Sequence, residues 1–473
     1  MINPFVMVIF GATGDLARTK LIPALFSLYK KKQLPKDFYI IGFARRDLIN
    51  DGFLQIFESL NDKKEWNDFL RYISYHQGDF SDEKAYISLT GKLNLLEKNN
   101  NHLNFLYYLA TPPVNYLEII HGLQESELID KKKEDIHRTR LIIEKPFGKD
   151  LETARNLDRK LSENFDERQI FRVDHYLAKE TVQNMIAFRF ANGIFEPVWN
   201  NNYIDHVQIT WGEVKGVGGR GKFFDGVGLL RDVAQNHLLQ LIATIAMEQP
   251  KTFSKEGVRD ARAKAIKAIR GISSKDILEN IVRGQYKDYL LEKDVSPKSE
   301  TETFVAMKLF VDSPRFKDVP FYLRAGKKVP KDVVEISIVF IQTCHILFKE
   351  FGCPEIGNVL TIHIQPDEGI ILRVITKKPD SKLALGTVDM KFTYQEEFGN
   401  KGADAYEKLL LDVFDGDQML FNRSDELESS WELITQILRG WESQGPVMKF
   451  YDSGTWGPIE ANRLIEKDGK KWL

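Results

Sequence analysis

Four side chains that can transfer protons or bind anions fall within one short stretch of the sequence, Arg172-Val173-Asp174-His175-Tyr176-Leu177-Ala178-Lys179-Glu180. A carboxylate, an imidazole, a phenol and an ammonium this close together are typical of a binding or catalytic cleft. A neutral imidazole can accept a proton near pH 7, and a carboxylate can orient it. The stretch therefore predicts a polar site.

A second polar cluster, Arg231-Asp232-Val233-Ala234-Gln235-Asn236-His237, lies in a helical pattern. Asp232 and His237 are candidates for an acid–base pair. A single histidine on a helix is more often a hydrogen-bonded structural group than a catalyst, and an isolated Asp–His pair is commonly a surface contact. The cluster alone leaves both interpretations open.

A glycine turn follows the first apolar run, in Gly11-Ala12-Thr13-Gly14-Asp15-Leu16-Ala17. Gly11 suits a tight turn after a strand, Gly14 lets the backbone approach a pyrophosphate, and Ala17 is small where a helix packs on the strand. The free amides of that helix start attract phosphate. The second glycine is displaced from G-x-G-x-x-G, so an ordinary strand-to-helix turn is the alternative. Pro23 is expected to divide the following helix.

The second apolar run ends in Arg45-Arg46. A dinucleotide fold usually places its ribose-binding residue here, and an acidic residue would favour NAD. Two arginines instead offer forked donors to the 2′-phosphate of NADP. A solvated strand end is the alternative, and Asp47 leaves weaker use of NAD open.

Positioning these residues requires two kinds of architecture. The first part alternates apolar runs with amphipathic segments, which predicts parallel strands at Phe5–Phe10, Phe38–Phe43, Tyr72–His76, Asn104–Ala110, Thr139–Glu144 and Gln169–Asp174. This is a doubly wound, Rossmann-like α/β domain, expected over residues 1–175. The pattern then changes, and residues 176–473 are expected to form a larger α+β domain with a mostly antiparallel sheet.

In this second part the expected helices cover Glu180–Phe190, roughly Leu229–Ile272, Ala405–Leu411 and Glu426–Glu442. The expected strands are Ile204–Gly212, Phe304–Val311, Val333–Ile341, Val359–Gln365 and Ile370–Thr376.

Composition excludes several classes of protein. The 473 residues contain 66 basic and 68 acidic side chains, a formal charge of −2, which argues against nucleic-acid and membrane-surface partners. The apolar N-terminus lacks a basic region and is expected to be a strand and not a signal peptide, while Ile336–Phe348 is too short to span a bilayer. Cys344 and Cys353 match neither a zinc pattern nor a disulfide framework, which fits a reducing, cytoplasmic setting. No metal site is expected.

The sequence resembles the glucose-6-phosphate dehydrogenase family over essentially its whole length. The resemblance is found in Gly11–Ala17, Glu144–Gly148, Arg172–Glu180, Arg231–His237 and Leu323-Arg324-Ala325-Gly326-Lys327. Asp-His-Tyr-Leu-x-Lys-Glu is its most specific motif, with Ala178 where the family usually has glycine. The resemblance implies an NADP-dependent enzyme that oxidises glucose 6-phosphate at C1 to 6-phosphogluconolactone, the first step of the oxidative pentose phosphate pathway.

The resemblance also implies residue roles. His237 matches the general base and Asp174 its orienting partner. The residues that match substrate-binding positions are His175, Tyr176 and Lys179 for the phosphate, Glu213, Asp232, Lys327 and Gln365 for the sugar, and Lys20 near both ligands. Those that match cofactor-binding positions are Gly11, Thr13, Gly14, Asp15, Leu16, Arg45, Arg46 as a second arginine, Tyr116 and Lys145.

This sequence departs from the family pattern near Lys327. Bacterial relatives usually have a second basic residue five positions later, where this chain has Asp332, and Lys331 is expected to take part of that role with Asp332 facing solvent. His363 replaces an arginine of the second, structural NADP site of some members, so that site is not expected. A homodimer or homotetramer is expected by analogy.

Two alternatives remain. Another NAD(P)-linked sugar dehydrogenase would share the dinucleotide turn and the Glu-Lys-Pro motif but lack the basic cluster around His175 and Lys179. A sugar sensor with a degenerate dehydrogenase fold would be expected to have lost His237 or Asp174, and both are present. The length and the missing signal sequence argue against a lumenal, lactonase-fused relative.

Overall fold

The computed structural model describes residues 2–57, 63–100, 102–129, 138–379, 382–399, 404–444 and 446–473. Contacts between residues divide the chain into two compact units. The first unit comprises Met1–Ala178 and two segments from later in the chain, Phe253–Arg259 and Ala403–Glu428. The second unit comprises Lys179–Thr252, Asp260–Gly402 and Ser429–Leu473.

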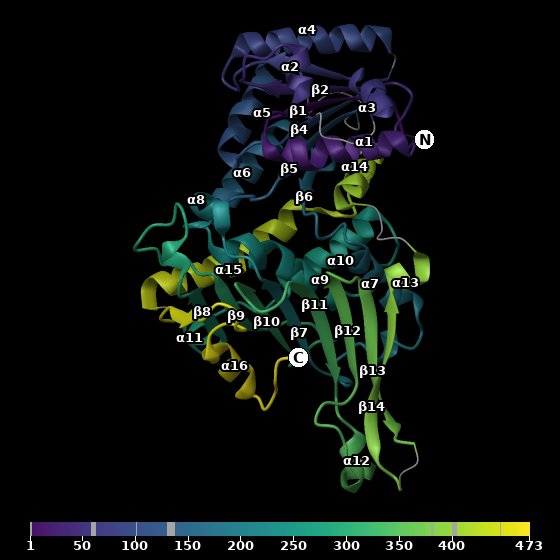
Figure 1. Ribbon diagram of the computed structural model, residues 1–473, viewed down its shortest axis with the longest axis vertical. Helices are drawn as coiled ribbons and strands as arrows, with labels where there is room; N and C mark the ends of the chain where they lie inside the picture. Colours follow the sequence, from purple (N-terminus) through teal and green to yellow (C-terminus); the bar gives the residue numbers. More distant parts are fainter. Residues whose placement is uncertain are drawn as a thin grey trace. The chain divides into compact units, whose positions relative to one another are not determined.

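The first unit is built on one sheet, whose strand order in the described residues is β15-β6-β5-β4-β1-β2-β3 (Figure 1). The strands are β1 (Phe5–Phe10), β2 (Phe38–Ala44), β3 (Ile73–Gln77), β4 (Asn104–Leu109), β5 (Thr139–Glu144), β6 (Ile170–Val173) and β15 (Phe421–Asn422). Strands β1 to β6 are parallel, and β15 is antiparallel to β6. The order of β1 to β6 is that of a doubly wound dinucleotide-binding fold, so the predicted fold is confirmed.

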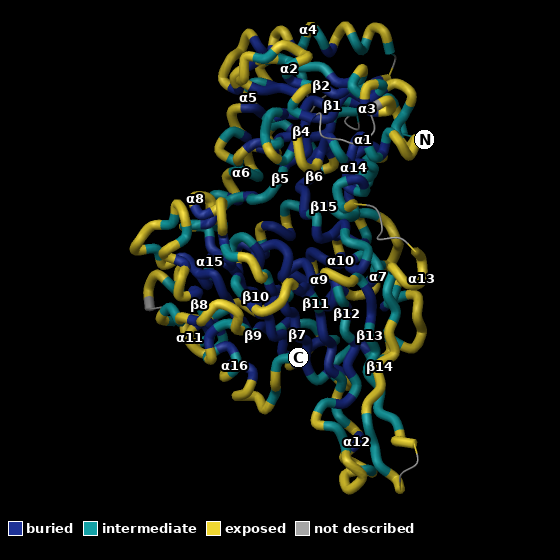
Figure 2. The backbone as a smooth tube through the Cα atoms, viewed as in Figure 1, coloured by how far each residue is buried: buried dark blue, intermediate teal, exposed yellow. Residues whose placement is uncertain are grey.

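Helices cover both faces of this sheet. Alternate residues of its strands point to opposite sides, and because both sets are apolar, both faces must be buried. Phe5, Met7 and Ile9 of β1 belong to one core, and the intervening residues Val6, Val8 and Phe10 to the other. The first core is completed by α1 (Ile22–Lys30), α2 (Asn50–Gln55), α3 (Lys63–Leu70) and α14 (Ala405–Asp415), the second by α4 (Glu83–Asn99), α5 (Tyr116–Glu125) and α6 (Leu151–Asn164). The tube of Figure 2 shows β1 and β2 as mostly buried segments.

The helical stretch after the glycine turn changes type beside Pro23. A π-helical segment, η1 (Ala17–Leu21), is followed directly by α1, and Pro23 lies in the first turn of α1. The helical backbone is nevertheless continuous here, since Leu21 and Ile22 both have right-handed helical angles, so the predicted division is only a change of helix type. Short 3₁₀ turns, η2 (Pro113–Asn115) and η3 (Glu167–Gln169), precede α5 and β6.

The second unit has a larger sheet, with described strand order β14-β13-β12-β11-β7-β10-β9-β8-β16. Its strands are β7 (Ile204–Glu213), β8 (Ile281–Tyr286), β9 (Phe304–Phe310), β10 (Pro320–Lys327), β11 (Val333–Phe340), β12 (Val359–Gln365), β13 (Gly369–Lys377), β14 (Leu385–Thr393) and β16 (Lys449–Tyr451). Two neighbouring pairs, β7 with β10 and β8 with β16, are parallel, and all other pairs are antiparallel. The predicted mostly antiparallel sheet is confirmed.

The helices of the second unit are α7 (Glu180–Ala191), η4 (Glu196–Val198), η5 (Gly218–Arg220), α8 (Gly221–Phe224), η6 (Leu230–Leu238), α9 (Leu239–Ala246), α11 (Ser274–Asn280), η7 (Tyr289–Leu291), α12 (Cys344–Phe348), η8 (Lys349–Phe351), α13 (Tyr394–Phe398) and α16 (Ile459–Glu466). Two helices, α10 (Lys255–Lys267) and α15 (Ser424–Gln444), begin in the first unit and end in the second. The helical region expected over Leu229–Ile272 is interrupted, because the chain turns extended at Met247 after α9. Among the described residues no helix has both the length and the apolar composition needed to cross a membrane.

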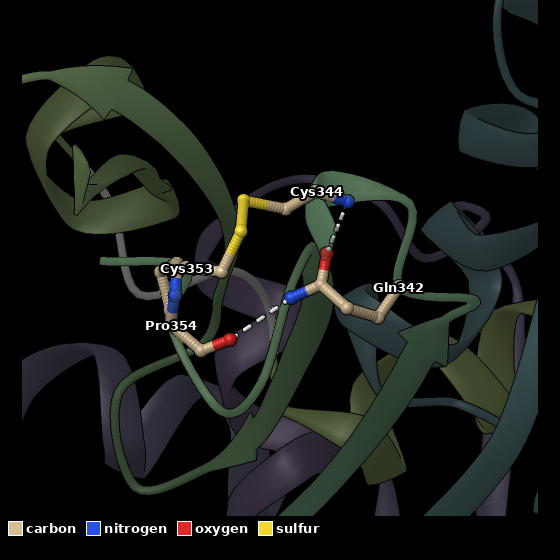
Figure 3. Close-up of a disulfide and its surroundings, with 4 residues drawn as sticks. All are labelled: Gln342, Cys344, Cys353 and Pro354. Carbon is tan, nitrogen blue, oxygen red and sulfur yellow. Dashed lines mark hydrogen bonds between the residues drawn. A yellow bond between two sulfur atoms is a disulfide. The ribbon is translucent and has the colours of Figure 1, made fainter. Parts of the chain in front are cut away.

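The two cysteines form a disulfide, so the prediction that they are not part of a disulfide framework is wrong. Cys344 begins α12, and Cys353 follows η8, with Cα atoms 5.9 Å apart (Figure 3). Gln342 holds both ends of this loop, since its side chain accepts the N–H of Cys344 and donates to the carbonyl of Pro354, each at 3.0 Å. The two cysteines are nine positions apart in the sequence, and the turn that brings their sulfurs together is not evident from this spacing. Because they are paired, the cysteines give no support for a reducing setting.

Candidate functional site

The glycine turn of the first unit is fixed against the end of β2. The N–H groups of Gly11 and Ala12 donate to the carbonyl of Phe43 at 2.8 and 3.3 Å, and Gly14 N–H donates to the carbonyl of Gly11 at 2.9 Å. Gly11 has a φ of +81°, and a Cβ there would lie 2.6 Å from the carbonyl oxygen of Ala110. The turn therefore requires glycine at this position. A dinucleotide pyrophosphate fits such a backbone cradle ahead of a helix start.

Residues Thr13, Asp15 and Leu16 complete this turn, and Lys20 is an exposed residue of η1. The Asp15 carboxylate pairs with Arg18 at 3.0 Å.

The arginine pair lies beside the turn, because the Phe43 carbonyl accepts hydrogen bonds from the turn, and Arg45 and Arg46 follow two and three residues later. The Tyr75 hydroxyl donates to the carbonyls of Ala44 and Arg46 at 2.8 and 2.5 Å, which fixes the chain here. The Arg45 side chain is 72% exposed, and among the described residues its one ionic partner is Asp79, at 3.9 Å. A weakly held guanidinium beside the pyrophosphate cradle is available to a 2′-phosphate.

A half-buried carboxyl group lies at the end of β5. Glu144 Oε1 accepts hydrogen bonds from the hydroxyls of Tyr108, at 2.5 Å, and Tyr406, at 3.3 Å. Burial raises the pKa of Glu144 to about 7, although both hydroxyls and Lys145 lower it. Tyr116 is fully buried, and its hydroxyl donates to the Glu144 carbonyl at 2.7 Å, so Tyr116 fixes the backbone immediately before Lys145.

The polar stretch after β6 forms a series of turns. Asp174 is 1% exposed, and its carboxylate accepts the N–H of Tyr176 at 3.1 Å. The His175 ring lies 4.7 Å from the ring of Tyr176 and stacks on Tyr406 at 6.4 Å between centroids. Tyr406 of α14 therefore contacts both His175 and Glu144. Tyr406 lies outside the local motifs of the sequence and was not predicted to belong to the site.

The second unit places another polar group where two parallel strands end. Glu213 ends β7 and Lys327 ends β10, and the strand register sets them opposite each other. The Lys327 ammonium bonds to the Glu213 carboxylate, and Lys327 is 3% exposed. Trp211 donates from Nε1 to Glu213 Oε1 at 3.1 Å. A buried cation and an accessible carboxylate at a strand end can bind hydroxyl groups.

The π-helix η6 brings two more predicted residues to this unit's site. The His237 ring stacks on Trp211, with centroids 5.1 Å apart and an interplanar angle of 4°. His237 is 1% exposed, and its backbone N–H donates to Asn236 Oδ1 at 2.6 Å. Asp232, in the first turn of η6, lies 3.7 Å from the guanidinium of Arg220. The structure thus brings His237 next to Glu213 through Trp211, a residue that sequence reasoning missed although period-two spacing puts it on the face of Glu213.

The remaining predicted residues lie elsewhere in the second unit. Lys179 precedes α7 and is 3.9 Å from Glu368, and Gln365 ends β12. Lys331 and Asp332 are both exposed, as expected for Asp332, whose carboxylate accepts the N–H of Val214 at 2.8 Å. His363 pairs with Glu335 at 3.2 Å.

Comparisons with known proteins agree over the whole chain. Residues 8–184 match the family model described as glucose-6-phosphate dehydrogenase, NAD binding domain, and residues 186–473 match its C-terminal domain. A glucose-6-phosphate 1-dehydrogenase of Chlamydia muridarum is 41% identical, with 99% of this chain and 96% of the relative covered. One of Aggregatibacter actinomycetemcomitans is 42% identical, with 98% and 96% covered.

Two solved structures are also similar to this chain. A glucose-6-phosphate dehydrogenase in complex with its substrate glucose-6-phosphate superposes with a TM-score of 0.91 at 35% identity and covers 100% of both chains. Glucose-6-phosphate 1-dehydrogenase from Mycobacterium avium gives a TM-score of 0.85 at 32% identity, with 100% of this chain and 99% of the other covered.

Proposed function

Because the chain belongs to the glucose-6-phosphate dehydrogenase family, we propose that it oxidises glucose 6-phosphate at C1 to 6-phosphogluconolactone with NADP. The observation that carries this proposal is the strand-end group of Glu213, Lys327 and Trp211 with the His237 ring stacked upon it. This group offers a buried cation and a carboxylate that can bind sugar hydroxyls, and an imidazole that can accept the proton of the oxidised hydroxyl.

In this mechanism His237 removes the proton of the C1 hydroxyl, and Asp174 is its orienting residue and stabilises the imidazolium. Glu213, Asp232 and Lys327 hold sugar hydroxyls, so that the C1–H bond keeps one orientation. The phosphate is bound by His175, Tyr176 and Lys179, with help from Lys331, and Gln365 and Lys20 complete the substrate contacts. A bound nicotinamide cofactor supplies the acceptor for the hydride.

On the cofactor side, the backbone of Gly11, Thr13, Gly14, Asp15 and Leu16 binds the pyrophosphate. Arg45 and Arg46 bind the 2′-phosphate, which favours NADP, with NAD as a weaker substitute. Tyr116 and Lys145 are assigned to the nicotinamide end, where the hydrogen bond from Tyr116 to the Glu144 carbonyl supports the placement of Lys145.

We also propose roles for the two domains, an oligomeric state and a location in the cell. Residues 1–175 bind the cofactor, and residues 176–473 bind the substrate and form the oligomer, a homodimer or homotetramer in the cytoplasm.

The test is an absorbance assay of the reduced nicotinamide, with glucose 6-phosphate or glucose as substrate and NADP or NAD as cofactor. The proposal predicts turnover with glucose 6-phosphate and NADP, slower turnover with NAD, and little with glucose. Equal rates with glucose and glucose 6-phosphate would indicate another sugar dehydrogenase, and silence in every combination would leave a sugar sensor.

A further inference from the structure

A buried carboxylate lies at the start of the helix that contains Asp232 and His237. Glu302 is 3% exposed and comes just before β9. Its Oε1 accepts the N–H of Leu230, the first residue of η6, at 2.9 Å, and its backbone carbonyl accepts the N–H of Leu229 at 3.1 Å. The first N–H groups of a helix have no partners inside the helix. Glu302 supplies two of the missing partners from a distant part of the chain.

The chain entering η6 is shaped around this carboxyl group. Gly228 has a φ of +74°, and a Cβ there would lie 2.1 Å from Glu302 Oε1 and 2.4 Å from Oε2. A side chain at position 228 would therefore displace the Glu302 carboxylate from its place beside η6. Burial raises the pKa of Glu302, while the Leu230 N–H and the charges of Arg283 and Arg231 lower it.

The neighbours of Glu302 contact the same loop on one side and Lys327 on the other. The Thr301 hydroxyl accepts the N–H of Gly226 at 2.8 Å and donates to the Asp225 carboxylate at 3.1 Å. The Thr303 carbonyl accepts the N–H of Lys327 at 3.0 Å. One short segment therefore fixes the approach to η6 and the backbone of a strand-end lysine.

We propose that Glu302 is a positioning residue for the dehydrogenase reaction, because it fixes the first turn of η6 and thereby the places of Asp232 and His237. Asp232 lies within that first turn and His237 at the other end of η6, so a displaced helix start moves both side chains. Reactions that depend on alignment lose rate steeply when a group moves by about 1 Å. The inference rests on the proposed roles of Asp232 and His237.

A purely structural role predicts a different kinetic result. Loss of stability would lower the active fraction and so lower kcat, without changing either KM. A positioning role predicts a lower kcat through His237 and a higher KM for glucose 6-phosphate through Asp232. The KM for NADP should not change, since the cofactor residues belong to the first unit.

The experiment compares Glu302→Asp, which shortens the side chain, with Glu302→Gln, which keeps its length and an acceptor oxygen. Glu300→Gln is the matched control, because the Glu300 side chain is 83% exposed. We expect kcat of Glu302→Asp to fall about 10- to 100-fold, with a several-fold higher KM for glucose 6-phosphate. Glu302→Gln should stay within about threefold of the wild type, as a retained hydrogen bond implies. Wild-type kinetics in Glu302→Asp, or equal losses in both variants with unchanged KM, would overturn the proposal.

Hydrogen exchange of the full-length protein gives a readout independent of activity. The peptide containing Leu229 and Leu230 should exchange faster in Glu302→Asp than in the wild type, Glu302→Gln or Glu300→Gln. If Glu302→Asp does not fold, rapid exchange of these amides in the wild type would itself overturn the proposal, and protection would support it. A wild-type enzyme inert toward glucose 6-phosphate would reject the proposed function, while the exchange comparison would still decide whether Glu302 fixes the start of η6.

Discussion

The Lys327 ammonium and the Glu213 carboxylate meet at the carboxyl ends of the parallel strands β10 and β7. Their surroundings differ, since the side chain of Lys327 is 4% exposed and that of Glu213 is 33% exposed. Breaking a charge pair is costly mainly because one charge is left without a partner, and the cost is greater where water cannot reach it. The two halves of this pair should therefore respond differently to substitution.

We expect Glu213→Gln to be more destabilising than Lys327→Met. The first change leaves a buried ammonium without its carboxylate and should lower the free energy of unfolding by about 3–5 kcal/mol. The second leaves a carboxylate that water and the Trp211 indole N–H can still reach, so the loss should be smaller. Urea unfolding followed by circular dichroism measures both, with the double variant completing the cycle. A larger loss in Lys327→Met would contradict this reasoning.

Replacing His237 by Asn should lower kcat by roughly 10²–10⁴, the range typical of a lost general base. Asparagine keeps a polar side chain of similar reach, so the protein should still fold and bind glucose 6-phosphate. Asp174→Asn should cost less, because Asp174 orients the base and does not take the proton. The exposed His121→Asn is the control, and steady-state kinetics give the result. Turnover near the wild-type rate in His237→Asn would remove His237 from the mechanism.

The parallel sheet could be predicted from sequence because its signals are local. The continuous apolar run of β1 and the position of Gly11 after it are both visible in one short stretch. Contacts between distant segments could not be predicted. Tyr406 reaches Glu144 across 262 residues, and Glu302 reaches Leu230 across 72. Neither residue lies in a motif, and each acquires its function only from the fold that brings it to its partner.

The prediction for the two cysteines was wrong for a related reason. Cys344 and Cys353 are joined by a turn through Gly352, with a φ of +82°, and by the side chain of Gln342. Spacing alone does not report such a turn. The strand β10 was also not predicted. Its sequence contains two charged residues, Arg324 and Lys327, which tertiary contacts bury, so it lacks the apolar pattern of a buried strand.

Stability should depend on pH through Glu144, whose pKa burial raises to about 7 from 4.5. Between these two values the folded protein holds a proton that the unfolded chain has released, so stability falls as the pH rises through this window. Glu144→Gln does not titrate. The free energy of unfolding of Glu144→Gln minus that of the wild type should therefore increase by about 1–3 kcal/mol between pH 5 and pH 8.

The measurement is urea unfolding of both proteins at several pH values, with the exposed Glu152→Gln as control. A constant difference between Glu144→Gln and the wild type across this pH range would show that Glu144 titrates near its ordinary pKa.

Arg45→Ala should weaken NADP binding by about 1–3 kcal/mol and leave NAD binding almost unchanged, as expected for the loss of one charge-assisted hydrogen bond. The ionic partner of Arg45 in the described part of the chain is Asp79, at 3.9 Å, so little stability should be lost with the guanidinium. Calorimetric titration of both cofactors measures the difference. Arg71→Ala, another exposed arginine of the same unit, is the control. Equal losses for the two cofactors would show that Arg45 does not bind the 2′-phosphate.

The final prediction concerns Lys331, which stands beside the acidic residue that replaces a basic one of bacterial relatives. The Asp332 carboxylate accepts a hydrogen bond from the N–H of Val214, the residue after Glu213, at 2.8 Å, and Asp332 is exposed. This hydrogen bond gives Asp332 a structural role that does not involve the substrate. Of these two neighbouring residues, Lys331 is then the one whose charge can attract the phosphate. Lys331→Ala should raise the KM for glucose 6-phosphate several-fold with kcat little changed, because it removes binding common to the ground state and the transition state.

Steady-state kinetics at two ionic strengths test this prediction, with the exposed Lys317→Ala as the matched control. The effect of Lys331→Ala should shrink as salt is added, because the charge of an exposed lysine is screened within a Debye length of about 8 Å at physiological ionic strength. Lys317→Ala should change neither constant. A KM for glucose 6-phosphate that is the same in Lys331→Ala and the wild type at low salt would mean that this enzyme binds the phosphate through His175, Tyr176 and Lys179 without a further lysine.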